Sequence, residues 1–327
     1  MENLLWLLSI QNRKGEIMAE YKADVLIIGS GPAGYTAGIY TARAGLKSLI
    51  VSGKQNGGQL ILSSEVDNYP GFVETMTGFE IMEKMRRQAE ARGVEIVDDI
   101  ITEVDFFDHP FTCSSAAGNS YQSKAIIVAT GSSVKWLGLP SEQKYMGHGV
   151  SSCATCDGFF YRGKEVAVVG GGNTAAEEAL YLATFTDKVY LIHRRHSLRA
   201  DTVLQQRLMQ NRKIVMVWNN VIEEVLGTDE PLLVTGLKIR NVKTDMQKTL
   251  HVSGLFVAIG HHPNTELFRN YLNLTSEGYI AVLSDGCSTN VKGVFAAGDV
   301  CSLEHHQAVI AAGSGAKAAL ETIKFLR

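Results

Sequence analysis

The chain has 327 residues, which is too long for one small hydrophobic core and predicts about two domains. Its composition is that of a globular protein, 45% hydrophobic and 20% charged. A net charge of −3 and the lack of long basic runs argue against nucleic acid or an anionic membrane surface as a partner. Five cysteines, an odd number in a chain that needs no covalent staples, argue against secretion and favour a cytoplasmic location.

The first 20 residues contain an apolar run at residues 4–8. No basic region precedes this run and no small-residue cleavage site follows it, so it is a poor signal peptide. It is also too short to span a bilayer. We expect residues 1–20 to be a leader outside the folded domains, disordered or misassigned as far as residue 17.

The first regular elements are a strand, a glycine-rich turn and a helix. A buried strand is predicted at residues 23–28, and the turn Gly29-Ser30-Gly31-Pro32-Ala33-Gly34 leads into a helix and a second strand at residues 48–51. The first glycine of such a turn permits the tight bend, the second lets the backbone approach a pyrophosphate, and the third lets the helix pack on the strand. The pyrophosphate then lies on the helix N-terminus. Ser52 and Gly53 offer no acid for the ribose contact that is typical of NAD.

Two further predicted strands each end in glycine. Residues 125–128 lead into Ala129-Thr130-Gly131, and residues 254–259 lead into Gly260. They bracket a second glycine motif, so we place the crossings between domains there. We predict an α/β fold with two Rossmann-like, three-layer dinucleotide-binding domains, the second inserted in the first. The inserted domain spans residues 132–259, and the outer domain combines residues 21–131 with residues 260–327.

The inserted segment carries the pair Cys153-Ala154-Thr155-Cys156, followed by Asp157. This spacing brings two thiols within disulfide reach, so that one can attack a partner disulfide and the other can resolve it. A zinc site would need a second ligand pair, and Cys113, Cys287 and Cys301 are scattered, so we expect no metal and three inert thiols. Asp157 is either a general acid for the leaving thiolate or a helix N-cap or turn residue.

The second glycine motif follows the dithiol. A strand at residues 165–169 precedes Gly170-Gly171-Gly172-Asn173-Thr174-Ala175, a helix through residue 183 and a strand at residues 188–192. Where an NAD site has an acidic residue, this chain has His193-Arg194-Arg195, with Arg199 one turn further. Guanidinium groups suit a 2′-phosphate, which favours NADPH over NADH; the alternative is a solvated basic face.

Taken in order, these and other motifs resemble the low-molecular-weight thioredoxin reductases over residues 21–327. The string at residues 153–160 ahead of the second glycine turn is the most specific of them. The matching motifs are Ser30-Gly31-Pro32-Ala33-Gly34-Tyr35, Gly57-Gly58-Gln59, Asn68-Tyr69-Pro70-Gly71, Ala129-Thr130-Gly131, Cys153-Ala154-Thr155-Cys156-Asp157-Gly158-Phe159-Phe160, Gly170-Gly171-Gly172-Asn173-Thr174, His193-Arg194-Arg195 and Gly298-Asp299-Val300.

The resemblance implies that the outer domain binds FAD, that the inserted domain binds NADPH, and that the protein is a homodimer. It also implies that Cys156 lies against the flavin, Cys153 attacks thioredoxin and Asp157 is the acid. The implied FAD-binding residues are Gly29, Ser30, Gly31, Pro32, Ala33, Gly34, Ser52, Gly57, Gly58, Gln59, Asn68, Ile101, Thr130, Gly131, Asp299, Val300, His306, Gln307 and Ala308. The NADPH-binding residues are Gly170, Gly172, Asn173, Thr174, Arg194, Arg195 and Arg199.

Three histidines depart from the family pattern. His306 stands before Gln307-Ala308 where the family commonly has Arg, which weakens a fixed positive charge near the flavin. His148 replaces a common Arg upstream of the dithiol, which affects docking of thioredoxin, and His262 replaces a frequent small residue.

The sequence predicts a thioredoxin-disulfide reductase. One alternative is a reductase of another disulfide carrier, glutaredoxin-like or peroxidase-associated. A dithiol oxidase or a reductase with another donor is opposed by the intact second glycine motif, and a non-catalytic nucleotide-binding protein is opposed by the presence of both cysteines. Because the dithiol and the NADPH motif share one segment and must serve one flavin, we expect that segment to rotate about hinges at residues 131–133 and 260–262.

Overall fold

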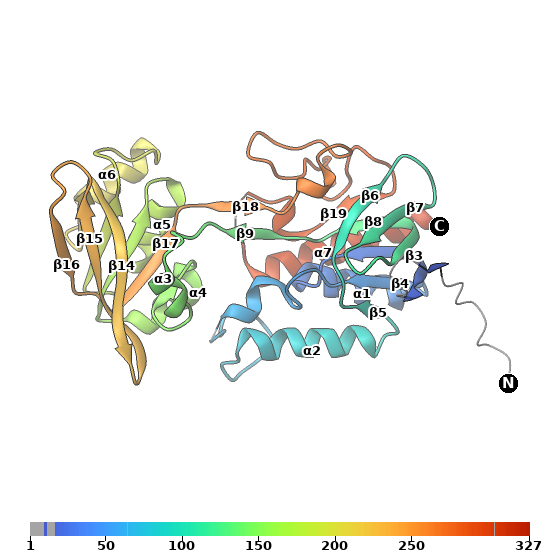
Figure 1. Ribbon diagram of the computed structural model, residues 1–327, viewed down its shortest axis with the longest axis horizontal. Coiled ribbons are helices and arrows are strands. Elements are labelled where there is room, and N and C mark those ends of the chain that lie inside the picture. Colours follow the sequence, from blue (N-terminus) through green and yellow to red (C-terminus); the bar gives the residue numbers. More distant parts are fainter. Residues whose placement is uncertain (1–9, 12–16, 64, 304) are drawn as a thin grey trace.

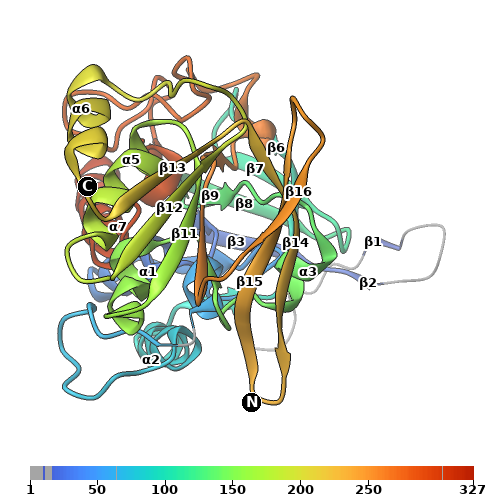
Figure 2. The ribbon, with the colours of Figure 1, turned by 90° about the vertical axis from the view of Figure 1, so that its left-hand side faces the viewer.

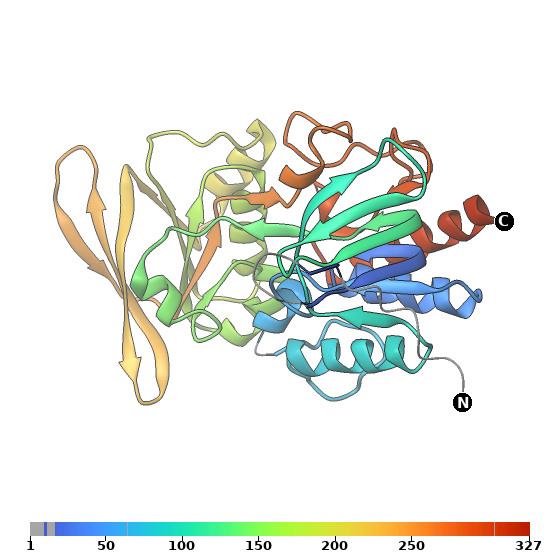
Figure 3. The ribbon, with the colours of Figure 1, turned by 45° about the vertical axis from the view of Figure 1, so that its right-hand side comes forward.

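The computed structural model describes residues 10–11, 17–63, 65–303 and 305–327. They form two lobes joined by two chain segments, β9 (Ser132–Val134) and β18 (His261–Pro263), which pair with each other as antiparallel strands (Figure 1). Both ends of the described chain belong to the first lobe, while the middle of the chain forms the second lobe (Figure 3). The predicted α/β fold, with a second domain inserted in the first, is confirmed.

A seven-stranded sheet forms the centre of the first lobe. Its strand order is β5-β4-β3-β8-β7-β6, and β19 pairs with β8. The inner parallel strands are buried on both faces at residues 25–28, 48–51, 125–128 and 294–296, as expected when helices and loops cover a parallel sheet. The parallel strands are β3 (Glu20–Ile28), β4 (Ser48–Val51), β5 (Glu95–Val97), β8 (Ser120–Val128) and β19 (Val294–Ala296); the antiparallel ones are β6 (Ile101–Asp105) and β7 (Phe111–Ser115).

Three helices lie along one side of this sheet (Figure 1). They are α1 (Pro32–Arg43), α2 (Gly78–Glu90) and α7 (Ala308–Leu326). Helices α1 and α7 pack so closely that a Cβ atom on Gly315 would lie 2.1 Å from the carbonyl oxygen of Ala33. The C-terminal helix therefore braces the helix that follows the first glycine turn. The opposite side of the sheet packs against Phe268 and Leu272.

The second lobe has three layers. Its parallel sheet has the order β10-β17-β11-β12-β13, with α5 and α6 on one side and the antiparallel sheet β14-β15-β16 on the other (Figure 2). Alternating residues of β11 serve the two sides: Val166 and Val168 face the helices, and Ala167 and Val169 face the second sheet. The elements are β10 (Val150–Ser151), β11 (Glu165–Gly170), α5 (Asn173–Leu182), β12 (Lys188–His193), α6 (Thr202–Gln210), β13 (Ile214–Trp218), β14 (Asn220–Asp229), β15 (Leu232–Asn241), β16 (Gln247–Leu250) and β17 (Gly254–Ala258).

The segment expected to be a leader holds two short strands. These are β1 (Ile10–Gln11) and β2 (Ile17–Met18), which pair antiparallel, and β3 begins at Glu20. Residues 1–9 and 12–16 lie outside the described part of the chain, so the expectation that residues 1–20 form a leader outside the folded domains stays a prediction. Within the described ranges, no helix has the length and apolar character needed to cross a membrane.

Candidate active site

The dithiol lies at the start of a short helix in the second lobe. Cys153 and Cys156 form a disulfide, and α4 (Ala154–Asp157) begins directly after Cys153. The backbone N–H groups of Cys156 and Asp157 donate to the Cys153 carbonyl at 3.2 and 3.1 Å. Ser151 Oγ accepts from the Cys153 N–H at 3.0 Å. These bonds fix the turn that brings the two sulfur atoms together, so the predicted redox pair is confirmed.

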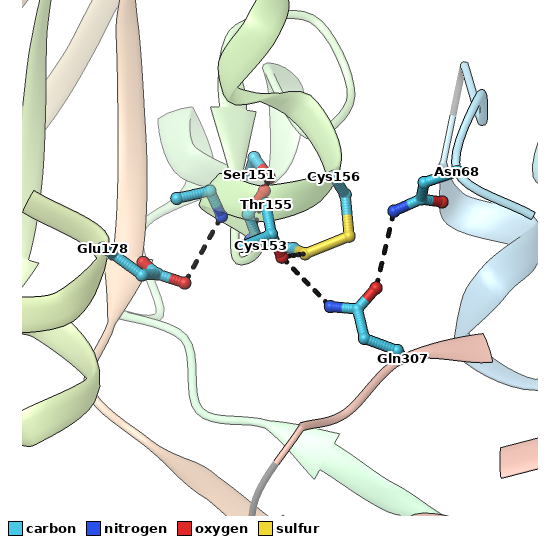
Figure 4. Close-up of a disulfide and its surroundings, with 8 residues drawn as sticks. Asn68, Ser151, Cys153, Thr155, Cys156, Glu178 and Gln307 are labelled. Atoms are coloured by element: carbon cyan, nitrogen blue, oxygen red, sulfur yellow. Dashed lines mark hydrogen bonds between the residues drawn. A yellow bond between two sulfur atoms is a disulfide. The ribbon is translucent and has the colours of Figure 1, made fainter. Parts of the chain in front are cut away.

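This turn faces the first lobe. Gln307 Nε2, at the start of α7, donates to Thr155 Oγ1 at 3.0 Å, and Asn68 Nδ2 donates to Gln307 Oε1 at 3.4 Å (Figure 4). Asn68 and Gln307 are both among the residues that the resemblance assigns to FAD. The structure thus brings the disulfide against expected flavin contacts from two distant parts of the chain.

Asp157 is the last residue of α4, next to Cys156. Burial raises the pKa of its carboxyl group above the ordinary value, against the lowering effect of a hydrogen bond with Ser151. Asp157 is also the N-cap residue of the 3-10 turn Gly158–Tyr161 that follows, although its side chain makes no capping hydrogen bond there, so its role as an acid stays a prediction. A carboxyl group that keeps its proton at unusually high pH beside a thiol suits a general acid.

The other three cysteines are free thiols in apolar surroundings. Cys113 and Cys287 are buried and Cys301 is half-buried. Burial raises the pKa of Cys113 to about 12, of Cys287 to about 11 and of Cys301 to about 12. Since the thiolate is the reactive form, these raised pKa values fit the expectation of inert thiols, which stays a prediction.

The first glycine turn has the shape expected of a pyrophosphate site. A Cβ atom on Gly29 would lie 2.3 Å from the Ala129 carbonyl oxygen, and one on Gly34 would lie 2.0 Å from the Gly29 oxygen. Among the described residues, in contrast, none beyond the immediate chain neighbours and the nearby helix backbone comes within 4 Å of a Cβ position on Gly31. Gly31 is also the N-cap residue of α1, and as a glycine it has no side chain that could accept hydrogen bonds from the first N–H groups of the helix. Open space above uncapped N–H groups fits the pyrophosphate of FAD.

Other expected FAD residues gather around this turn. Ser30 Oγ donates to the Ser52 carbonyl at 2.9 Å and accepts from the Gly57 N–H at 3.1 Å. A Cβ atom on Gly58 would lie 3.1 Å from Gly31 Cα. Burial raises the pKa of the Asp299 carboxyl in the 3-10 turn Gly298–Val300, and a cavity of about 210 Å³ opens beside this residue and the start of α7.

The remaining expected FAD residues lie near the crossings and the sheet edge. Gln59 Nε2 donates to the Ser132 carbonyl in β9. Thr130 and Asn264 exchange two hydrogen bonds, both 2.8 Å long, so Asn264 is a structural partner that the sequence reasoning missed. His306 lies 4.4 Å from His261 between ring centroids, with its Nε2 atom 3.0 Å from the Ser302 carbonyl. Buried Ile101 begins β6.

The second glycine turn repeats the design of the first. A Cβ atom on Gly170 would lie 2.3 Å from the Ala258 carbonyl oxygen. The Cβ position of Gly172, in contrast, has no atom of the described chain within 4 Å apart from its chain neighbours and the nearby helix backbone. Gly172 is the N-cap of α5 and provides no side-chain cap. Asn173 is engaged with Asp201 through two hydrogen bonds of 2.8 and 2.9 Å. The turn again leaves room for a pyrophosphate over helix N–H groups.

A basic segment adjoins this second turn. The Arg199 N–H donates to the Gly171 carbonyl at 2.7 Å, and the side chains of Arg194, Arg195 and Arg199 are exposed. The buried Nε2 atom of His193 has no hydrogen-bond partner in the described part of the chain. Guanidinium groups beside an open glycine turn fit a 2′-phosphorylated nicotinamide cofactor.

Comparison with known proteins adds to this geometry. Residues 23–315 match the family model described as pyridine nucleotide-disulphide oxidoreductase. A thioredoxin reductase from Rickettsia conorii is 52% identical over 302 residues, which cover 92% of this chain and 97% of the relative. The chain belongs to the thioredoxin reductase family. It is accordingly an NADPH-dependent, FAD-containing disulfide oxidoreductase, as the sequence predicts.

Solved structures of the family superimpose on this chain to different degrees. The thioredoxin reductase from Giardia duodenalis is 37% identical, covers 94% of this chain with 99% of its own and gives a TM-score of 0.88. The thioredoxin reductase from Lactococcus lactis, described as in the FR conformation, is 38% identical and covers 93% of this chain with 99% of its own. Its TM-score is only 0.63.

Proposed function

We propose that this enzyme is a thioredoxin-disulfide reductase, in which bound FAD carries electrons from NADPH to the Cys153–Cys156 disulfide and the dithiol passes them to thioredoxin. The observation that carries the proposal is the hydrogen bond between Thr155, inside the dithiol turn, and Gln307. It holds the disulfide against the residues expected to contact the flavin. The runner-up is the same chemistry on a glutaredoxin-like or peroxidase-associated carrier.

The chain's own residues have distinct roles in this proposal. The Cys153 thiolate attacks one sulfur of the partner disulfide and forms a mixed disulfide, while the other partner sulfur leaves. The Cys156 thiolate then attacks Cys153, which restores the 153–156 disulfide and releases the second partner sulfur. Asp157, whose pKa burial raises, gives a proton to a leaving thiolate.

In this proposal the two lobes bind different cofactors. We assign FAD binding to residues 21–131 and 260–327 and NADPH binding to residues 132–259, with the individual residues that the resemblance implies. Each open glycine turn lies in its own lobe, and the basic segment adjoins only the second. A homodimer and a cytoplasmic location complete the proposal; sedimentation velocity on the purified protein tests the first, and fractionation of cells tests the second.

Rotation of the second lobe follows from the same assignment. With the dithiol turn against Gln307, this turn would cover the flavin bound by the first lobe, so the nicotinamide would need another arrangement of the lobes. Gly131 and Gly260, which flank the two crossings, have φ angles of +68° and +106° that suit glycine hinges. Two relatives of nearly equal identity and coverage superimpose with TM-scores of 0.88 and 0.63, which supports two lobe arrangements in the family.

The function is tested by an anaerobic flavin-reduction assay with separate acceptors. We expect NADPH to bleach the flavin absorbance faster than NADH, and oxidised thioredoxin to restore it. A glutaredoxin-like and a peroxidase-associated carrier serve as parallel acceptors. If either of these restores the absorbance and thioredoxin does not, the runner-up replaces the proposal.

The basic segment gives a prediction about cofactor choice. Changing Arg194→Ala together with Arg195→Ala is expected to raise the KM for NADPH while the KM for NADH stays nearly constant. Each lost charge-assisted contact to the 2′-phosphate is worth about 1.5–3 kcal/mol, so the preference for NADPH falls by about tenfold or more. Steady-state kinetics with both cofactors measure the preference for NADPH over NADH. Arg207→Ala, which changes an exposed arginine on α6, is the matched control. An unchanged preference for NADPH in the double variant would show that Arg194 and Arg195 form only a solvated basic face.

A further inference from the structure

A second carboxyl group approaches the dithiol from the nucleotide-binding helix. Glu178, on α5, accepts a hydrogen bond through Oε1 from the Ala154 N–H at 3.3 Å (Figure 4). That N–H belongs to the peptide that directly follows Cys153. Glu178 therefore ties the helix of the second glycine turn to the turn that holds the disulfide.

The other oxygen of this carboxyl group is unusual. Oε2 of Glu178 is buried and has no hydrogen-bond partner within the described residues. A buried, unpartnered carboxylate oxygen is costly, and protonation removes most of the cost. Burial accordingly raises the pKa of Glu178 to about 7, the Ala154 hydrogen bond opposes the rise, and the neighbouring Glu177 adds to it.

Within the described residues, no cation on the elements around α5 contributes to the environment of this carboxyl group. On α4 the titratable groups are the two cysteines and Asp157, and on α5 itself Glu177 is exposed. In the strands beneath α5, Glu165 pairs with Lys188 at 3.0 Å and accepts from Tyr190 at 2.9 Å, and the His193 ring packs on Gly171. Arg207 on α6 is exposed to solvent.

We propose that Glu178 is a positioning residue that anchors the dithiol turn and whose charge sets how readily the 153–156 disulfide is reduced. Reduction breaks the S–S bond with two electrons and two protons and leaves a dithiol, which loses a proton to give a thiolate as the pH rises. An ionised Glu178 next to this turn disfavours the thiolate, because both groups are negative. A protonated Glu178 is neutral and does not disfavour the thiolate.

The pH range in which the charge of Glu178 affects reduction follows from the raised pKa of this carboxyl group. Below pH 7 Glu178 carries its proton, so removing its charge changes little. Above pH 7 the carboxylate opposes the thiolate, so a neutral side chain favours the reduced pair. This inference rests on the proposed function only in taking the pair as redox-active. It needs neither NADPH nor thioredoxin.

The test is the thiol–disulfide equilibrium of the holoenzyme with glutathione, read by alkylation of free thiols and mass spectrometry at pH 6 and pH 8. Two glutathione molecules supply the two electrons and two protons and become glutathione disulfide. Glu178→Gln keeps the acceptor oxygen and removes the charge. We expect it to match the unchanged enzyme at pH 6 and to be about 3- to 10-fold more readily reduced at pH 8. Glu177→Gln, its exposed neighbour, is the matched control and is expected to show no such difference.

Two further measurements keep the proposal falsifiable. In the unchanged enzyme, the rate of Cys153 alkylation against pH is expected to show an additional inflection near pH 7, and Glu178→Gln is expected to lose it. Glu178→Ala, which also removes the hydrogen bond, is expected to slow disulfide turnover, and Gln is expected to restore the rate. Equal equilibria for Glu178→Gln and the unchanged enzyme at both pH values would overturn the proposal, as would an equal shift in Glu177→Gln. Neither result bears on whether thioredoxin is the acceptor.

Discussion

Replacing Cys153 or Cys156 with serine is expected to abolish the reduction of thioredoxin and to leave flavin reduction by NADPH intact. The reason is that the disulfide lies downstream of the flavin, on the turn held against Gln307. Stopped-flow absorbance follows the flavin, and an insulin-reduction assay follows thioredoxin. The activity that remains in either variant is expected to be indistinguishable from background.

A control separates loss of chemistry from loss of fold. Cys301→Ser changes a half-buried thiol with a pKa raised to about 12, and it is expected to keep full activity. Continued turnover of thioredoxin by Cys156→Ser would show that electrons reach the partner by another path. A loss of flavin binding in both variants would point to structural damage instead.

Locking the two lobes as they stand in this structure is expected to block flavin reduction by NADPH. The lobes approach at residue 147, where a Cβ atom would lie 3.6 Å from the Leu62 carbonyl oxygen. Leu62→Cys and His148→Cys place exposed thiols on the two sides of this contact, and a short bismaleimide joins them. The native pair is protected as a disulfide during the reaction. NADPH is then mixed anaerobically with the cross-linked enzyme and the flavin absorbance is followed.

The locked enzyme carries its own controls. Dithionite is expected to reduce the flavin of the cross-linked protein normally. The reduced flavin is then expected to open the 153–156 disulfide, because the proposed arrangement places the dithiol turn against the residues expected to contact the flavin. Each single variant treated with the reagent is expected to behave like the untreated enzyme. Flavin reduction by NADPH at full rate in the locked protein would rule out the rotation.

The predictions from sequence succeeded where local pattern determines structure. The strand at residues 48–51 matches β4 residue for residue, and the two glycine turns lead into α1 and α5 as expected. Apolar runs beside glycines specify such units through steric limits on the backbone, which act within a few residues. The second sheet of the inserted lobe was missed because β14 has register shifts near Ile222 and Leu226 that break the alternation of a regular strand.

The site was only partly predictable because one of its contacts joins residues that are far apart in the sequence. Cys153, Cys156 and Asp157 are neighbours in sequence, but the contact of Thr155 with Gln307 joins residues 152 positions apart. Glu178 carried a local signal that was not used. It lies three residues after buried Ala175 and four before buried Leu182, so the helical period already places it on the inner face of α5.

The close packing of α7 on α1 has a consequence for how the protein is made. The first glycine turn is synthesised before the second lobe, but β19 and α7, which complete its surroundings, are synthesised after the second lobe. The second lobe comes from one continuous stretch and has all its sheet strands before β18. It can therefore fold while the first lobe is still open, since domains fold as units during synthesis. Binding of FAD would then follow the folding of the second lobe, so the dithiol turn forms before the flavin is bound.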